Sequence, residues 1–166
     1  MKLKVAFYKK GNSIYSRLIR LWTKSIYSHT ELVIQTKCKH KSYWITSDPA
    51  VGHVIVRESP NIDLDHWDFV EIKNVNSTNA EKIVKLVKEE IGKKYDYLGI
   101  FLSQIFPFEI QNPDKWFCSE IVSYLLKNSG IKDIEYILNY HPQYYNPGNL
   151  FDRLMEYYKK VNYDDR

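Results

Sequence analysis

The chain has 166 residues, a formal net charge of +4 at pH 7 and a pI near 8.9. This length suits a single domain over residues 1–166. The apolar run at the N-terminus is short and interrupted by charge, and no run approaches the ~18 residues of a membrane span, so we expect neither a signal peptide nor stable membrane insertion. Basic and acidic residues are mixed along the chain without a basic arm, so we expect no nucleic acid as a partner.

A short strand is predicted from Leu3 to Tyr8, followed by a basic amphipathic helix. Asn12 or Ser13 can cap this helix, which runs to about Lys24. Its apolar side consists of Ile14, Leu18, Leu21 and Trp22. Its basic side consists of Arg17, Arg20 and Lys24. Such a helix can lie on an anionic membrane. We favour the more ordinary interpretation, in which the helix packs on its own domain and its charges face water.

The next segment, from His29 to Thr36, alternates and is rich in β-branched residues, which predicts a strand. Period two places His29, Glu31 and Val33 on one face of that strand. A histidine two residues before a carboxylate is either a surface pair without consequence or part of a site.

The turn after this strand contains Cys38 and His40. Two ligands in one turn are too few for a zinc site, and we predict no metal ion and no cofactor. The two cysteines of the chain, Cys38 and Cys118, make no disulfide framework and are typical of a reducing compartment. Because Cys38 lies in a Lys-rich turn, we expect it to be exposed and to have no role in any activity.

Three more strands follow, and then the pattern becomes helical. The strands are predicted at Tyr43–Ser47, His53–Glu58 and Trp67–Lys73. Their short connections favour an antiparallel meander. A helix capped by Ser77 or Thr78 then runs to Ile91, and Gly92 ends it.

The second half of the chain holds further helices and an aromatic loop. The segment from Gly92 to Phe106 leads into a mostly apolar helix, and Asn149 is expected to cap a last helix to about Lys160. Tyrosines in the loop of residues 140–149 could stack on a sugar or grip a peptide. We favour the alternative that they seal the end of a small core.

The segment from Lys115 to Gly130 places a cysteine at the start of a helix. Its apolar residues recur with helical spacing at Ile121, Val122, Leu125 and Leu126. Cys118 therefore lies in the first turn, where unpaired N–H groups and the positive end of the helix dipole favour the thiolate. The competing interpretation is that Cys118 is an inert core residue, as many cysteines in apolar helices are.

The order of these parts resembles a known family. The segment Gly92-Lys93-Lys94-Tyr95-Asp96-Tyr97-Leu98-Gly99 precedes Cys118-Ser119-Glu120, and the strand Ser28-His29-Thr30-Glu31-Leu32-Val33 comes before both. This is similar to the permuted branch of the NlpC-type, papain-like cysteine hydrolases, the YiiX-like group, which is related to lecithin:retinol acyltransferase and poxvirus homologues. In unpermuted members the histidine strand follows the cysteine helix. The resemblance extends from Phe7 to about Leu150 and is also seen with small phage-encoded members.

The resemblance implies an α+β, circularly permuted papain-like fold in which an antiparallel sheet packs on the Cys118 helix. It also implies a nucleophile at Cys118, a base at His29 and an oxyanion site formed by the Cys118 N–H and the Tyr95 hydroxyl.

The group that orients the imidazole is left open. Relatives draw it from the strand after the histidine, which here offers Thr46, Ser47 or Asp48. Glu31 shares a face with His29, but Cβ atoms two residues apart on a strand lie ~6.5–7 Å from each other, so its side chain must fold back. We place Glu31 slightly ahead of Ser47 and Asp48, and a Cys/His dyad is the remaining alternative.

The implied activity is hydrolysis or acyl transfer at an amide or ester bond through a thioester on Cys118. The first expected substrate is a peptide of the peptidoglycan type, cut by a peptidase or amidase. Lipids are the acyl-ester alternative, and a non-catalytic binding module on the same fold is the second hypothesis. We expect a cytoplasmic protein, which for a phage-type member would be the cytoplasm of the infected host.

Overall fold

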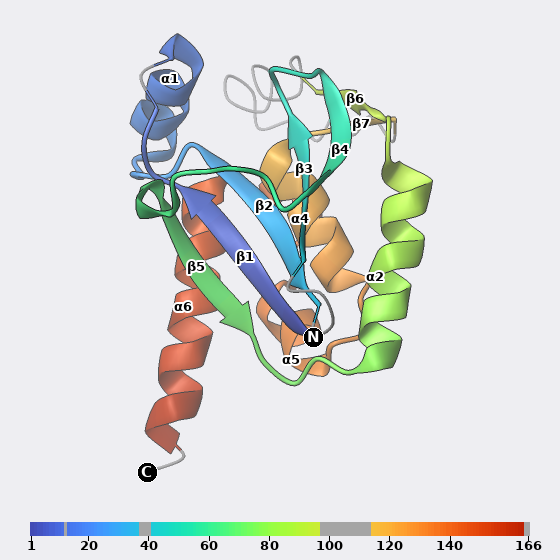
Figure 1. The fold of residues 1–166 in the computed structure, drawn as a ribbon. Helices are drawn as coiled ribbons and strands as arrows, with labels where there is room; N and C mark the ends of the chain where they lie inside the picture. Colours follow the sequence, from blue (N-terminus) through green and yellow to red (C-terminus); the bar gives the residue numbers. More distant parts are fainter. Residues whose placement is uncertain (12, 37–40, 97–113, 165–166) are drawn as a thin grey trace.

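The fold is built around a seven-stranded sheet with the order β5-β1-β2-β3-β4-β6-β7, shown in the computed structural model of Figure 1. The structure describes residues 1–11, 13–36, 41–96 and 114–164, with residues 159–164 described by their backbone only. The strands are β1 (Lys2–Tyr8), β2 (His29–Gln35), β3 (Ser42–Asp48), β4 (His53–Glu58), β5 (Trp67–Ile72), β6 (Lys94–Tyr95) and β7 (Lys115–Trp116). The helices within the described ranges are α1 (Ile14–Thr23), α2 (Ser77–Glu90), α4 (Cys118–Lys127), α5 (Lys132–Ile137) and α6 (Pro147–Asp164), with 3-10 turns η1 (Leu64–His66) and η2 (Pro142–Tyr144).

Strands β1 to β4 form the expected antiparallel meander, but the last predicted strand does not continue it. β5 pairs antiparallel with β1 instead of β4. The connection through η1 carries the chain across to β1, where β5 satisfies the backbone groups on the second edge of that strand. The short strands β6 and β7 pair parallel, so the sheet is mixed and the expectation of a wholly antiparallel sheet is wrong.

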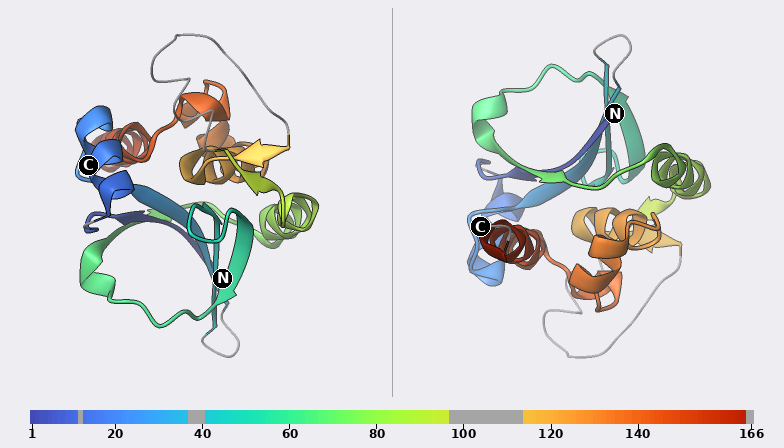
Figure 2. Two further views of the ribbon diagram at one scale, coloured as in Figure 1. Left: turned by 90° about the horizontal axis from the view of Figure 1, so that it is seen from above. Right: turned by 90° about the horizontal axis from the view of Figure 1, so that it is seen from below.

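Helices α2, α4, α5 and α6 lie on one side of the sheet, which curls away from them (Figure 2). The alternation of β2 explains how both faces are filled. Leu32 and Ile34 join the large core beneath the helices. Val33 points the other way and packs with Ala6 and Trp44 in a smaller cluster. The predicted period-two pattern of this strand is confirmed.

α4 is the helix at the centre of that core. Its apolar side chains are fully buried at Ile121, Val122, Leu125 and Leu126. Phe117, in extended conformation, precedes the helix, and its N–H donates to the Glu120 carboxylate at 3.3 Å. The helix therefore begins at Cys118, in agreement with the predicted first turn.

Two helix starts differ from the sequence prediction because an earlier asparagine takes the capping position. Asn76 is extended, and its side chain accepts the Asn79 N–H at 2.9 Å, so Asn76 caps α2 in place of Ser77 or Thr78. The Asn146 side chain likewise accepts the Asn149 N–H at 3.0 Å. α6 accordingly begins at Pro147, upstream of the predicted cap.

α1 begins as predicted, because the Ser13 hydroxyl accepts the Ser16 N–H at 3.1 Å. Its environment is not the one we favoured, since α1 contains no buried residue. The interpretation that its apolar side packs on the domain is therefore wrong. Asn12, Cys38, His40 and most of the apolar segment after Gly92 lie outside the described residues.

The turn between α1 and β2 is held closely against the first turn of α6. A Cβ atom on Gly148 would lie 2.5 Å from the Cβ atom of Ser25. Ser25 in turn accepts the Tyr27 N–H at 3.2 Å, within the short connection that leads to His29. Gly92 differs, because a Cβ there would meet nothing within 4 Å while the backbone has a φ of +85°.

Candidate active site

The first residue of β2 and the first residue of α4 meet at one end of the fold. The His29 imidazole is hydrogen-bonded to the Cys118 side chain. Cys118 as a residue is 1% exposed, and the His29 side chain is 16% exposed. The structure therefore brings together the two residues that the sequence placed far apart in the chain.

Glu31 lies on the other side of the imidazole. Its Oε1 atom is 3.3 Å from Nε2 of His29, so the side chain does fold back along the strand. The same oxygen accepts a hydrogen bond from Nη2 of Arg57, which comes from β4. Glu31 is 1% exposed, so this carboxylate is buried between the imidazole and the guanidinium.

Thr46 adds a second acceptor at the same ring nitrogen. Its hydroxyl donates to the Thr30 carbonyl at 2.9 Å and lies 3.4 Å from Nε2 of His29. Because the hydroxyl proton is used by the carbonyl, the oxygen presents a lone pair to an Nε2–H group. With Glu31 and Thr46 both facing Nε2, Nδ1 is the ring nitrogen left for Cys118.

The pKa shifts of His29 and Glu31 agree with an ion pair between these two side chains. Burial alone lowers the pKa of His29, but electrostatic attraction and hydrogen bonding from Cys118, followed by those from Glu31, outweigh it and raise that pKa to about 10. Burial alone raises the pKa of Glu31, but His29 and Arg57 outweigh it and hold that pKa below its ordinary value. The imidazole is therefore cationic at neutral pH.

The rivals for the orienting position make their described contacts elsewhere. The Ser47 hydroxyl donates to the Trp116 carbonyl at 2.8 Å. The Asp48 carboxylate accepts the Ala50 N–H at 2.8 Å, in the turn between β3 and β4. Of the residues that the sequence offered for this position, Glu31 and Thr46 lie at the imidazole, and Glu31 is the one that supplies a carboxylate.

Tyr95 lies in β6 and is buried at 4% exposure. Its ring is 6.5 Å, centroid to centroid, from that of Phe117, the residue that precedes α4. β6 pairs with β7 through Tyr95 and Trp116, two residues before Cys118. The structure thus brings Tyr95 to the helix start, while its oxyanion role stays a prediction.

Arg57 and Glu120 were not singled out from the sequence. Arg57 becomes visible only when β4 is paired across β3 with β2, because it is 26 positions from Glu31. Glu120 is buried in the first turn of α4, and burial together with the Asp96 carboxylate raises its pKa to about 7, although the Phe117 N–H acts against this. An acid at that position could have been read as a capping residue of the helix.

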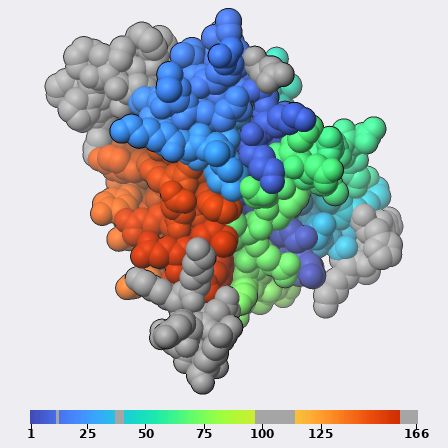
Figure 3. Space-filling model, turned by 90° about the vertical axis from the view of Figure 1, so that its left-hand side faces the viewer, coloured from blue at the N-terminus to red at the C-terminus, as the bar shows by residue number. Residues whose placement is uncertain are grey.

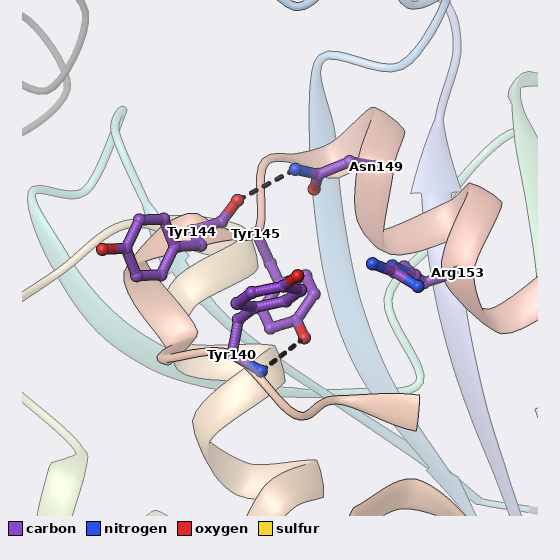
Figure 4. A pocket seen from close by; sticks show the side chains of 5 residues that line it. All are labelled: Tyr140, Tyr144, Tyr145, Asn149 and Arg153. Carbon is purple, nitrogen blue, oxygen red and sulfur yellow. Dashed lines mark hydrogen bonds between the residues drawn. The ribbon is translucent and has the colours of Figure 1, made fainter. Parts of the chain in front are cut away.

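A pocket of about 500 Å³ lies beside the chain segment that contacts the start of α4. It is lined by Tyr140, Tyr144, Tyr145, Asn149 and Arg153 (Figure 4). The Tyr145 hydroxyl accepts the Tyr140 N–H, and the Ser119 hydroxyl donates to the Tyr145 carbonyl. Tyr145 is buried whereas Tyr140 and Tyr144 are about half exposed, so the prediction that the loop tyrosines seal the core describes Tyr145 alone of these three.

The described residues offer no group of three His, Cys, Asp or Glu side chains placed to hold a metal ion. Within the same ranges, no helix combines the length and the apolar character needed to cross a membrane.

Comparisons with known proteins support the fold. No protein-family model and no curated protein sequence matches the chain. Among solved structures it is similar to YiiX of Escherichia coli O157:H7, described as a metalloprotein, with a TM-score of 0.55 and 24% sequence identity. The likeness covers 78% of this chain and 66% of the YiiX chain, so this chain spans slightly less than two thirds of that protein. The chain has a YiiX-like fold.

Proposed function

We propose that the chain is a cysteine hydrolase or acyltransferase that acts on an amide or ester bond through a thioester on Cys118. The observation that carries this proposal is the line of side chains from Cys118 through His29 to Glu31 and Arg57. It combines a nucleophile at a helix start, a cationic imidazole and a buried carboxylate that orients it, which is the arrangement that thiol acyl transfer requires.

The reaction follows from these positions. The Cys118 thiolate attacks the carbonyl carbon, and the His29 imidazolium gives its proton to the leaving amine or alcohol as the carbon–nitrogen or carbon–oxygen bond breaks. His29 then takes a proton from water, or from an acceptor hydroxyl or amine, which attacks the thioester. The acyl group leaves as an acid or as the new acyl product, and the thiolate is restored.

The negative oxygen formed at each attack needs hydrogen-bond donors. The Cys118 N–H, at the first turn of α4, is unpaired within its helix and is suited to this role. The Tyr95 hydroxyl is the proposed second donor, supported by the position of Tyr95 in β6 beside Phe117.

The family resemblance makes a peptide of the peptidoglycan type the first substrate class, in keeping with a permuted NlpC-type enzyme. The YiiX neighbour is described as a metalloprotein. Because the described residues of this chain offer no set of three metal ligands, the proposed steps use protein groups alone.

One observation favours a second candidate, a non-catalytic module on the same fold. Cys118 is 1% exposed, and a substrate carbonyl must come within bonding distance of its sulfur. The enzyme therefore has to open locally before it reacts, whereas an inert module need not open. The two candidates therefore predict a different dependence of the Cys118 alkylation rate on pH, and not only different absolute rates.

The test is the pH profile of Cys118 alkylation by iodoacetamide in a Cys38→Ser background, which leaves one thiol. The proposed reaction needs a thiolate–imidazolium pair between Cys118 and His29, and such a pair predicts an alkylation rate that is nearly constant from about pH 6 to about pH 8. In His29→Ala the rate should rise with pH toward the ~8.5 midpoint of an ordinary thiol. Burial lowers the rates but does not create a plateau.

His141→Ala is the matched control, since His141 is exposed and precedes η2. It should retain the wild-type plateau. A wild-type profile that already rises like that of His29→Ala would contradict the enzyme and support the inert module.

A further inference from the structure

The outer surface of α1 is apolar. The exposed fractions are 73% for Ile14, 71% for Tyr15, 56% for Leu18, 78% for Leu21 and 41% for Trp22. Ile14, Leu18 and Leu21 are spaced by four and three residues and therefore lie on one helix face, and Tyr15 and Trp22 adjoin it. The helix projects at one end of the fold in Figure 1, and the N-terminal residues form the top of the surface in Figure 3.

The side of α1 that faces the protein is the more polar one. Its partly buried residues are Ser16, Ile19, Arg20 and Thr23. Arg20 donates to the Gly11 carbonyl at 2.7 Å, and the Thr23 hydroxyl donates back to the Ile19 carbonyl. A surface helix of a globular protein normally turns its apolar stripe inward. In α1 this orientation is reversed.

The charge around this apolar face has one sign. Residues 1–30 contain seven Lys and Arg and no Asp or Glu. Lys9 is paired with Asp68, but Arg17 and Lys24 are exposed, and no ion pair of either is found among the described residues. They flank an apolar face that ends in aromatic residues, which is the composition of helices that lie in a membrane interface.

We propose that α1 docks the protein on an anionic lipid bilayer, with the helix in the plane of the interface. Leu18, Leu21 and Trp22 would enter the boundary between headgroups and acyl chains while Arg17 and Lys24 contact lipid phosphates. A second copy of the chain fits less well, because pairing two such faces would bring basic residues of the same sign together without a described acidic partner. The proposal is independent of the proposed thiol chemistry.

Docking through α1 would also orient the molecule. α1 ends at Thr23 and β2 begins at His29, so the helix and the candidate active site are joined by a short connection. That connection is fixed against α6 by the close approach of Gly148 to Ser25. The candidate site would therefore be held at a defined height above the lipid surface.

The experiment is co-sedimentation of the full chain with vesicles of equimolar phosphatidylglycerol and phosphatidylcholine, compared with pure phosphatidylcholine vesicles. The anionic vesicles should bind about tenfold or more tightly than the neutral ones, and added salt should reduce the difference. The double variant Leu18→Ser/Leu21→Ser should bind about tenfold more weakly. Arg17→Gln/Lys24→Gln should lose a similar factor on anionic vesicles only.

Matched controls use equally exposed positions on other helices. Tyr136→Ser on α5, where Tyr136 is 79% exposed, controls for the loss of apolar surface. Lys85→Gln/Lys88→Gln on α2 controls for the loss of charge. Both should bind like the wild type, and circular dichroism should show the same helix content in every variant.

Three outcomes would overturn the proposal. Absence of vesicle binding by the wild type is the first, and an equal loss of binding in the α1 variants and their controls is the second. The third is a concentration-dependent dimer that Leu18→Ser/Leu21→Ser dissociates, because the apolar face would then belong to a second copy of the chain.

Discussion

α1 and α4 are both ten-residue helices with apolar residues at helical spacing, yet they have opposite surroundings. α4 is packed against the sheet and against α2, α5 and α6, so that even its polar residues Ser119 and Ser123 are buried. α1 contains no fully buried residue and turns its apolar stripe outward. Periodicity therefore determines where a helix forms, whereas the remaining elements determine which side of it is covered. α4, the inner helix, supplies the candidate nucleophile, whereas α1, the outer helix, supplies an exposed apolar surface.

The largest expected effect is on turnover at the start of α4, where Glu31 of β2 contacts the His29 imidazole beside Cys118. Glu31→Gln keeps the side-chain shape but removes the charge that holds the imidazolium, so turnover should fall ~10²–10⁴-fold. Hydrolysis of a chromogenic acyl ester would measure kcat and KM, and kcat should carry the loss. Asp48→Asn, at a rival position at the end of β3, should stay near wild type. Equal losses in both variants would remove Glu31 from its orienting role.

The next effect compares one leucine from each helix. Leu125 of α4 is fully buried, and Leu125→Ala should reduce the free energy of unfolding by about 2–5 kcal/mol. Leu21 of α1 is 78% exposed, and Leu21→Ala should change it by less than about 0.5 kcal/mol. Urea unfolding measures both. A comparable loss of unfolding free energy in Leu21→Ala would mean that α1 is covered in solution, and the two helices would then not differ in burial.

A smaller effect concerns the buried acid in the first turn of α4. The folded-state pKa of Glu120, about 7, exceeds its ordinary value of 4.5, so the folded protein binds more protons between these values than the unfolded chain. Stability from this group is present below about pH 4.5 and is lost as the pH rises through about 7. Glu120→Gln, which keeps an acceptor for the Phe117 N–H, should remove this loss.

Thermal unfolding of wild type and Glu120→Gln across this pH range would measure the difference. The variant should be more stable above pH 7 by up to about 3 kcal/mol and should gain little near pH 4.5. A gain that is constant with pH would show that Glu120 is not the titrating group.

The smallest effect should be confined to the outer helix. Ser13→Ala removes the side-chain cap of α1, worth about 1 kcal/mol. Because α1 contributes no buried residue, this loss should appear as hydrogen exchange about fivefold faster in its amides, without a change in global unfolding. Exchange in α4 is the internal control. An equal acceleration in α4 would show that the two helices open together.

The sequence predicted those features that local patterns encode. The spacing of apolar residues after Cys118 predicted α4 and its first turn, and the alternation after His29 predicted β2 and the face shared with Glu31. Both predictions rest on the spacing of apolar residues within a single helix or strand, a pattern that is complete within ten residues or fewer.

Long-range pairings could not be predicted in the same way. Arg57 meets Glu31 because β4 pairs with β3 and β3 with β2, a register that depends on three strands at once. β5 was expected to pair with β4 in the meander and instead pairs with β1. This pairing depends on the curl of the sheet, which is a property of the whole fold. The exposed face of α1 was missed for the same reason. The catalytic roles of Cys118, His29 and Tyr95 stay predictions.

Gly148 and Gly92 lead to different expectations for natural variation. At position 92 the constraint comes from the positive φ, and asparagine, which tolerates that conformation, should occur there as an alternative to glycine. At position 148 the constraint is the space occupied by Ser25, and no side chain can satisfy it unless Ser25 moves. A survey of viable sequences should therefore find substitution at position 148 only together with a change at position 25. The origin of this covariation is steric, and because the Ser25 turn leads to β2, such changes would alter the position of His29.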